Sequence, residues 1–256
     1  MARTQKIYIV GNWKMNPDTI DAAKAIFSAS ERAAKKARKV SVIIAPPAPF
    51  LAALSRGSKK KTFLSAQDVH QAPDGAHTGG VSARQVREAG ASYVIIGHSE
   101  RRADGDTEEI VAKKVVTALD AGLRVILCVG ESMRDDHGVY LQEVEKKVSS
   151  VFSVIPKKYL SDVIVAYEPS WAIGKGYDSA LSPQGIHEMI IFIKKVIAEV
   201  VGREEAMRTP VLYGGSVDFT NAQAILSDGE VSGLLIGRQS LDTEAFSNII
   251  LYANRL

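Results

Sequence analysis

The feature that most constrains the fold is a regular alternation of short apolar runs and longer amphipathic segments along the whole chain. The apolar runs are rich in β-branched residues and are not interrupted by polar ones, which indicates strands buried on both faces, as in a parallel sheet. Eight strands are predicted in this way: Ile7–Val10, Val40–Ala45, Thr62–Ala66, Tyr93–Gly97, Val125–Val129, Val163–Tyr167, Val211–Tyr213 and Leu234–Gly237.

Helical segments are predicted in the spaces between these strands. Ser82 and Gln85 have the spacing of a capping box, and the helix that they begin should end at Gly90. A second helix is predicted over residues 106–121, before Gly122. The other predicted helices are Leu51–Arg56 and Met133–Ile155, together with those that begin at Asn16-Pro17, Ser182-Pro183, Asp218 and Asp242.

The number and order of these elements predict a barrel. Eight β/α units in 256 residues fit a single-domain α/β protein, a (β/α)8 barrel of the TIM type that spans residues 1–256. No linker or low-complexity segment divides the chain. The alternative is an open, doubly wound sheet, but the first turn, Gly11-Asn12-Trp13, lacks the glycine fingerprint of dinucleotide-binding folds.

The composition argues against nucleic acid and membranes as partners. The net charge is only +3, and the basic residues are dispersed and not interleaved with aromatic ones. No apolar run reaches the length of a membrane span, and residues 1–6 lack the apolar core of a signal peptide. The single cysteine, Cys128, excludes an intrachain disulfide. We therefore expect a cytoplasmic protein in which Cys128 serves packing and is not a nucleophile.

Residues 166–176 contain the most informative candidate for a site. The sixth predicted strand leads directly into a carboxylate, Glu168, and the proline that follows stops the strand. Large apolar residues in the loop favour a lid that closes over a ligand and excludes water. The lid residues are Pro169, Trp171, Ile173, Gly174, Lys175 and Gly176. The alternative is that Glu168 forms a salt bridge and Trp171 fills a surface groove.

Polar residues follow four other strands of the predicted barrel. Because the carboxyl ends of barrel strands share one rim, these residues should meet around one site with Glu168. They are Asn12, Lys14, His98, Ser99, Glu100, Gly214, Gly215, Ser216, Gly237 and Arg238. Glycine-containing turns beside helix starts favour an anion, so a sugar-phosphate-sized ligand is expected. Read singly, these residues could also be a solvated lysine, a structural histidine and ordinary turns. The other histidines, His70, His77, His137 and His187, share no metal-ligand spacing.

Four motifs together resemble those of the triosephosphate isomerase family. They are residues 11–16 (GNWKMN), 96–102 (IGHSERR), 167–174 (YEPSWAIG) and 213–217 (YGGSV). They occur in the order and spacing of the family, so the resemblance covers essentially the whole chain. It implies a glycolytic and gluconeogenic enzyme that interconverts dihydroxyacetone phosphate and D-glyceraldehyde 3-phosphate through an enediolate, with no metal and no cofactor.

The resemblance also implies a role for each matching residue. Glu168 would be the base, while His98 and Asn12 would donate hydrogen bonds to the enediolate oxygen and Lys14 would supply positive charge. A neutral imidazole is implied for His98, since this family is itself a well-known example of such tuning. Supporting roles are implied for Ser99 beside the base, for Glu100 beside the lysine, for the backbone N–H groups of Gly174, Ser216, Gly237 and Arg238 at the phosphate, and for Tyr213 and Ser216 at the closed lid.

The sequence departs from the pattern of the family at three positions. Lys175 replaces the usual threonine of the lid, Arg238 replaces a glycine of the phosphate turn, and Gly80 replaces a glutamate. Glycine accepts positive φ and arginine resists it, so Arg238 raises the question of backbone strain. We expect its guanidinium to face solvent.

The long loop at residues 67–81 bears on assembly. In the family the loop tip, which matches Thr78, inserts into a partner subunit, and the glutamate replaced by Gly80 pairs across the interface with the arginine that matches Arg101. We therefore expect a homodimer, with a tetramer as the alternative. Two alternatives to the function remain open: an isomerase of four-carbon ketose phosphates, and a non-catalytic phosphate-binding barrel.

Overall fold

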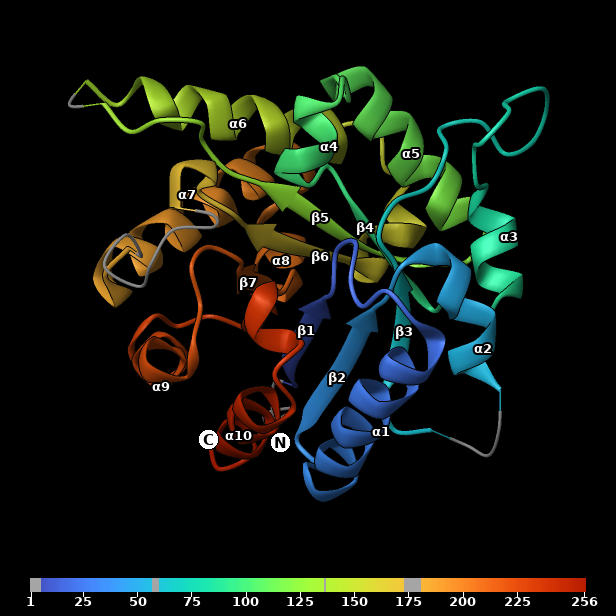
Figure 1. The fold of residues 1–256 in the computed structure, drawn as a ribbon. Coiled ribbons are helices and arrows are strands. Elements are labelled where there is room, and N and C mark those ends of the chain that lie inside the picture. Colours follow the sequence, from blue (N-terminus) through green and yellow to red (C-terminus); the bar gives the residue numbers. More distant parts are fainter. Residues whose placement is uncertain (1–5, 57–59, 136, 173–180) are drawn as a thin grey trace.

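The strands of the computed structural model close into a parallel barrel (Figure 1). The structure describes residues 6–56, 60–135, 137–172 and 181–256. In chain order the strands are β1 (Ile7–Asn12), β2 (Val40–Ala45), β3 (Phe63–Ala66), β4 (Tyr93–Ile96), β5 (Arg124–Val129), β6 (Val163–Tyr167), β7 (Val211–Tyr213) and β8 (Gly233–Ile236). Each strand pairs in parallel with the next and β8 pairs with β1, so the predicted (β/α)8 barrel is confirmed.

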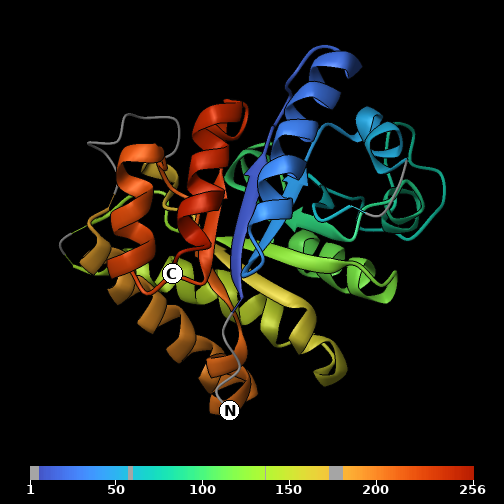
Figure 2. The same cartoon turned by 90° about the horizontal axis from the view of Figure 1, so that it is seen from below.

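Helices cover the outside of the barrel, as Figure 2 shows. They are α1 (Ile20–Lys36), α2 (Leu51–Ser55), α3 (Ala83–Glu88), α4 (Ser99–Ala103), α5 (Glu108–Asp120), α6 (Val139–Phe152), α7 (Pro183–Val201), α8 (Arg203–Arg208), α9 (Phe219–Asp228) and α10 (Thr243–Ala253). Short 3-10 turns lie at Ala48–Phe50, Lys157–Asp162, Ser170–Ala172 and Arg238–Ser240. The capping box of Ser82 is confirmed, and Ser182, Asp218 and Asp242 cap their helices as predicted.

Three predicted helix boundaries are wrong. The first helix does not begin at Asn16-Pro17 but at Ile20, where the Thr19 hydroxyl accepts a hydrogen bond from the Ala22 N–H. The helix predicted from Asp106 begins at Glu108, and its cap is Thr107. The helix predicted over Met133–Ile155 spans only Val139–Phe152. In each case a local polar contact, which propensity does not reveal, fixes the first turn.

The strands are buried on both faces, as their continuous apolar character predicts. One apolar cluster fills the barrel interior and includes Val10, Ile43, Ile95, Ile126 and Cys128. A larger cluster lies between the strands and the surrounding helices. Burial and the neighbouring Glu168 carboxylate raise the pKa of Cys128 well above its usual value, so this residue stays a neutral thiol in the core.

The loop between β3 and α3 reaches away from the barrel. Residues 67–81 contain neither helix nor strand, as the sequence predicts, and Thr78 near the loop tip is exposed. Met15, which follows β1, is 89% exposed, although it is a large apolar residue. Within the described ranges, none of the helices combines the length and the apolar character that crossing a membrane requires.

Candidate active site

Side chains from several strand ends line a cavity of about 410 Å³ at the carboxyl end of the barrel. Asn12, Lys14, His98 and Glu168 all line this cavity, as do residues 214–216 and 237–238. These strand ends therefore meet around one cavity, as predicted, whereas Ser99 and Glu100 line two neighbouring cavities instead. Among the described residues, no group of three His, Cys, Asp or Glu side chains is placed to hold a metal ion.

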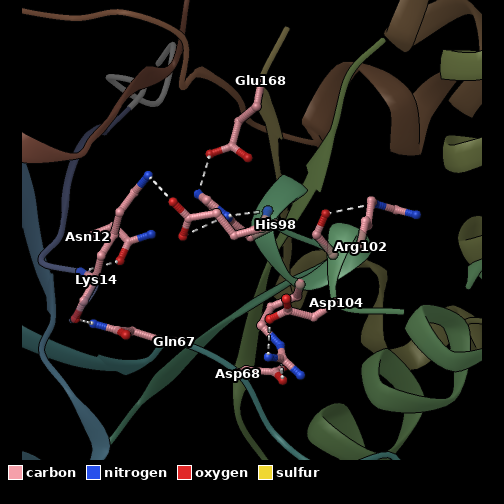
Figure 3. Close-up of polar contacts among 11 residues, drawn as sticks. Asn12, Lys14, Gln67, Asp68, His98, Arg102, Asp104 and Glu168 are labelled. Carbon is pink, nitrogen blue, oxygen red and sulfur yellow. Dashed lines mark hydrogen bonds and ion pairs between the residues drawn. The ribbon is translucent and has the colours of Figure 1, made fainter. Parts of the chain in front are cut away.

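Glu168 is a buried carboxylate at the end of β6. Its residue is only 4% exposed, and its backbone N–H donates to the Val129 carbonyl at 2.7 Å, which ties the chain to β5. The Glu168 Oε1 atom lies 3.6 Å from His98 Nε2 (Figure 3). A carboxylate held in so dry a place, with an imidazole as its neighbour on the cavity side, is placed to accept a proton.

The tautomer of His98 follows from its position at the start of α4. The His98 side chain caps this helix, because Nδ1 accepts a hydrogen bond from the Glu100 N–H at 3.2 Å. An imidazole nitrogen that accepts a hydrogen bond carries no proton, so in the neutral ring the hydrogen is on Nε2. This N–H is directed toward Glu168 and the cavity, where it can donate to an oxygen of a ligand.

Lys14 is held in a strained backbone conformation directly after β1. Its φ is +52°, which is unusual for a residue with a side chain, and its N–H donates to Asn12 Oδ1 at 3.0 Å. Gln67 donates from Nε2 to the carbonyl oxygens of Lys14 and Ala45, each at 2.8 Å. These bonds hold Lys14 at the cavity wall. Since Asn12 Oδ1 is occupied as an acceptor, the Nδ2 group of Asn12 can donate a hydrogen bond to a ligand.

Glu100 fixes the other end of the lysine. The Lys14 Nζ atom donates to Glu100 Oε1 at 2.6 Å (Figure 3). Desolvation opposes ionisation of this glutamate, but the hydrogen bond and the charge of Lys14 outweigh it and lower the pKa of Glu100. The glutamate side chain is 57% exposed, so solvent screens the pair, and its main effect is to position the ammonium group.

The two turns at the far side of the cavity can accommodate an anion. Asn221 in the first turn of α9 donates to the Ser216 carbonyl at 2.9 Å and so fixes the turn after β7. Arg238 follows Gly237 and starts a 3-10 turn without positive φ, because in the described part of the chain only Lys14 and Glu230 combine a side chain with positive φ. Arg238 therefore fits without the strain that its sequence suggests, and its side chain is exposed, as predicted.

Gly214 leaves the room in which the Glu168 side chain lies. A Cβ atom at this position would approach Glu168 Cγ to 2.7 Å and Oε1 to 3.1 Å. We expect Gly214→Ala to fold, because a flexible side chain can move away, but to lower kcat about 100-fold by displacing the carboxylate. Steady-state kinetics with circular dichroism would check this. Gly185→Ala is the matched control, because a Cβ there makes only ordinary contacts. Equal kinetics in the two variants would contradict the argument.

Glu131 is a candidate functional residue that the sequence analysis missed. It is fully buried just after β5 and accepts hydrogen bonds from Tyr167 Oη at 2.9 and 3.0 Å and from Trp171 Nε1 at 2.9 Å. Arg134 pairs with it at 3.2 Å. The sequence did contain a signal for Glu131: like Glu168, it is a carboxylate close behind the end of an apolar strand. Trp171 therefore does not simply fill a surface groove, because its indole anchors the start of the predicted lid.

The chain is attached to the barrel on both sides of residues 173–180, at the start of the predicted lid and at Leu181. Ser170 donates its N–H and its hydroxyl to the Glu131 carbonyl at 3.0 and 2.8 Å, while the Leu181 N–H donates to Tyr213 Oη at 3.4 Å. Burial raises the pKa of Tyr213 to about 12, so the hydroxyl stays protonated. The other predicted lid and phosphate residues, Ile173, Gly174, Lys175 and Gly176, lie outside the described residues.

Ser99 and Arg101 have surroundings that the sequence did not predict in detail. Ser99 lines a small cavity with Glu168, and Glu168 Oε2 has no hydrogen-bond partner among the described residues. Arg101 pairs within its own chain, with Asp68 at 3.1 Å and with Asp104 at 2.9 Å.

The fold and the site define a class of (β/α)8-barrel enzymes in which a buried carboxylate and an imidazole lie together in a cavity at the carboxyl end of the barrel. The family described as triosephosphate isomerase matches residues 7–253. Proteins of that name are similar over nearly their whole length: 37% identity in Coprinopsis cinerea (96% of this chain, 98% of the relative), 39% in Halorhodospira halophila (94% and 95%) and 36% in Geotalea uraniireducens (97% and 99%). This chain belongs to the triosephosphate isomerase family.

Proposed function

We propose that this chain interconverts dihydroxyacetone phosphate and D-glyceraldehyde 3-phosphate through an enediolate, without a cofactor. The observation that carries the proposal is the approach of Glu168 Oε1 to within 3.6 Å of His98 Nε2, in a cavity that Lys14 also lines. Family membership and near-complete coverage of the relatives support it. The chain would act as one barrel domain in the cytoplasm, a location supported by its single, buried cysteine.

Glu168 would remove the proton next to the substrate carbonyl. Such a hydrogen is weakly acidic, so the reaction needs a base that is poorly hydrated and correctly placed. Burial of Glu168 supplies the first condition, and the cavity left by Gly214 supplies the second. The same carboxyl group would then return the proton to the neighbouring carbon. A second proton must pass from the hydroxyl oxygen of the enediolate to the former carbonyl oxygen, and His98 Nε2, which faces the cavity, would carry it.

His98, Asn12 and Lys14 would stabilise the charge that develops on the oxygens. The Nε2–H of His98 and the Nδ2 group of Asn12 are both held in place by bonds at their other ends. Donors that are fixed before the reaction contribute strongly, because they need no reorganisation in the transition state. Lys14 adds a positive charge that serves both the enediolate and the phosphate.

The phosphate would lie at the turns after β7 and β8. We assign its binding to the backbone N–H groups of Ser216, Gly237 and Arg238, and to Gly174 when the lid closes. The lid, residues 169–176, would exclude water so that the enediolate is reprotonated and does not expel phosphate. Tyr213 and Ser216 would hold the closed form.

The test is isomerisation of glyceraldehyde 3-phosphate by the purified chain in the presence of a chelator, followed with a coupled dehydrogenase. We expect turnover that is insensitive to the chelator and is lost in Glu168→Gln. Four-carbon ketose phosphates should turn over far more slowly. Absence of turnover of both substrates, with phosphate-analogue binding intact, would reject the proposal in favour of a non-catalytic barrel.

We also propose that the chain forms a homodimer through residues 67–81. Beside this loop is a second cavity of about 570 Å³, which Asn12 and Lys14 also line. Met15, the residue after Lys14 in the sequence, is exposed. An exposed apolar side chain next to a large open cavity fits burial by a partner. Sedimentation equilibrium should give a dimer mass that Thr78→Arg reduces and the control Thr243→Arg, on α10, does not. A monomer mass for the unmodified chain would refute the proposal.

A further inference from the structure

A third, much smaller cavity lies against Glu168. The space in it that is open to a water-sized molecule is about 20 Å³, and its lining includes Gly97, Ser99, Arg102, Cys128 and Glu168. Among the described residues, Glu168 is the only one that lines both this cavity and the 410 Å³ cavity. The carboxylate therefore separates the two spaces, and a group bound in the small one would contact the base without contacting the substrate.

Two polar atoms of this lining have unmet hydrogen-bonding capacity. Arg102 Nη2 and Glu168 Oε2 are buried, and neither has a hydrogen-bond partner among the described residues. The Glu168 side chain is only 3% exposed. One atom is a donor and the other an acceptor, and buried polar groups of native proteins are normally satisfied by protein or by water. A single water needs roughly 10–15 Å³ and at least two polar partners, and this cavity provides both.

The rest of the Arg102 side chain holds the guanidinium in place. Arg102 Nε donates to the Gly97 carbonyl at 2.8 Å, and Nη1 pairs with Glu108 Oε1 at 2.7 Å, with both side chains largely buried (Figure 3). A Cβ atom at Gly97 would lie 3.1 Å from Arg102 Nη2, so the glycine provides the space for this nitrogen. The fork shape of arginine thus leaves one nitrogen for the cavity while two others are bound.

We infer that the small cavity binds one water molecule, which accepts a hydrogen bond from Arg102 Nη2 and donates one to Glu168 Oε2. Arg102 is then a positioning residue. Through the water it keeps the carboxylate ionised and holds Oε2 away from the substrate, so that Oε1 faces His98 and the cavity where the substrate would bind. The inference rests on the proposed function, because it assigns Arg102 to a base that acts in that reaction.

Other charged or titratable groups around Glu168 do not replace this contact. Those that line the two cavities beside it are His98, Lys14, Asp218 and Arg238 in the larger cavity, and Cys128 and Lys147 in the smaller one. The histidine is on the Oε1 side, and Lys14, two residues after β1, pairs with Glu100. Lys147 is bound to the Gly130 carbonyl and to Glu143, each at 2.7 Å. The Cys128 thiol is neutral and contributes only a weak S–H donor to the Glu168 carboxyl group, not a charge. Arg102 is therefore the cation in the small cavity with a buried nitrogen, Nη2, that has no hydrogen-bond partner among the described residues.

The test compares two variants that both lack the buried Glu108 charge. Removing Arg102 alone would leave that carboxylate buried and unpaired, so the variants are Glu108→Gln and the double variant Arg102→Gln/Glu108→Gln. A buried cation favours the charged form of a carboxylate that it reaches through a water. Since the base must be ionised to act, the acid limb of the profile of kcat/KM against pH should move upward by about one pH unit in the double variant relative to Glu108→Gln.

Each outcome decides something. An acid limb at the same pH in both variants would overturn the inference, as would a high-resolution crystal structure of the unmodified protein without a water between Arg102 and Glu168. If the double variant does not fold, Arg102→Lys serves in its place, because lysine keeps the charge that pairs with Glu108 but lacks the second nitrogen of the guanidinium. The acid limb should then move to higher pH by a smaller amount, and an unmoved limb would again overturn the inference. Full activity in Glu168→Gln would instead refute the proposed function itself.

Discussion

Replacing Glu168 with aspartate should lower kcat by at least about 100-fold while KM changes little. The shorter side chain withdraws the carboxylate from the reacting carbon but keeps its charge and leaves Lys14 and the phosphate turns unchanged. A general base contributes about 10²–10⁴-fold, and a displacement of about 1 Å is enough to lose much of this. Because substrate binding does not use the base, the loss should be in the transition state only.

The measurement is steady-state kinetics in both directions of the isomerisation. Glu168→Gln should lose at least as much, since the amide has the right length but cannot accept the proton. Glu188→Asp is the matched control, because this glutamate is exposed on α7 and far in sequence from the strand ends. Unchanged turnover in Glu168→Asp, with native circular dichroism, would remove Glu168 from the role of base.

Most of the fold could be predicted because the local apolar and capping patterns agree with the barrel that the whole chain forms. The strands are continuous apolar runs, their lengths are set by buried residues, and every predicted strand is within two residues of its observed bounds. The errors are in helix boundaries, where a single polar side-chain contact determines the first residue of the helix. Thr19 and Thr107, and not Asn16 or Asp106, cap their helices, and Asp106 instead pairs with Lys114 at 2.6 Å. An ion pair between Asp106 and a buried lysine eight residues further along the chain cannot be predicted from local helix propensity.

The site was predictable to the extent that it follows strand ends. Asn12, His98 and Glu168 each come directly at or after a strand, and barrel closure brings them together. The supporting contacts were not predictable in the same way. Glu131 binds Trp171 forty positions further along the chain, and Asp68 binds Arg101 thirty-three positions further along. Such contacts depend on the register of neighbouring strands and on loop paths, which one sequence does not specify.

Replacing His98 with glutamine should lower kcat about 10²–10³-fold, the loss that follows removal of one fixed donor to a developing oxyanion. Glutamine can place an amide near the position of Nε2. It lacks, however, the rigid ring that the Glu100 N–H orients by its bond to Nδ1. A donor that must reorganise during the reaction stabilises the transition state less than one already in place.

The His98→Gln loss should be in kcat rather than in KM, because the donor matters most when charge develops on the oxygen. Steady-state kinetics together with the inhibition constant of an enediolate-like phosphate analogue would measure it: the analogue should bind more weakly in the variant, whereas inorganic phosphate should bind equally well. The control is His187→Gln, since His187 is on α7 outside the cavity. If the variant bound the analogue as tightly as the unmodified chain and kept its turnover, the donor to the enediolate would have to come from Asn12 and Lys14 alone.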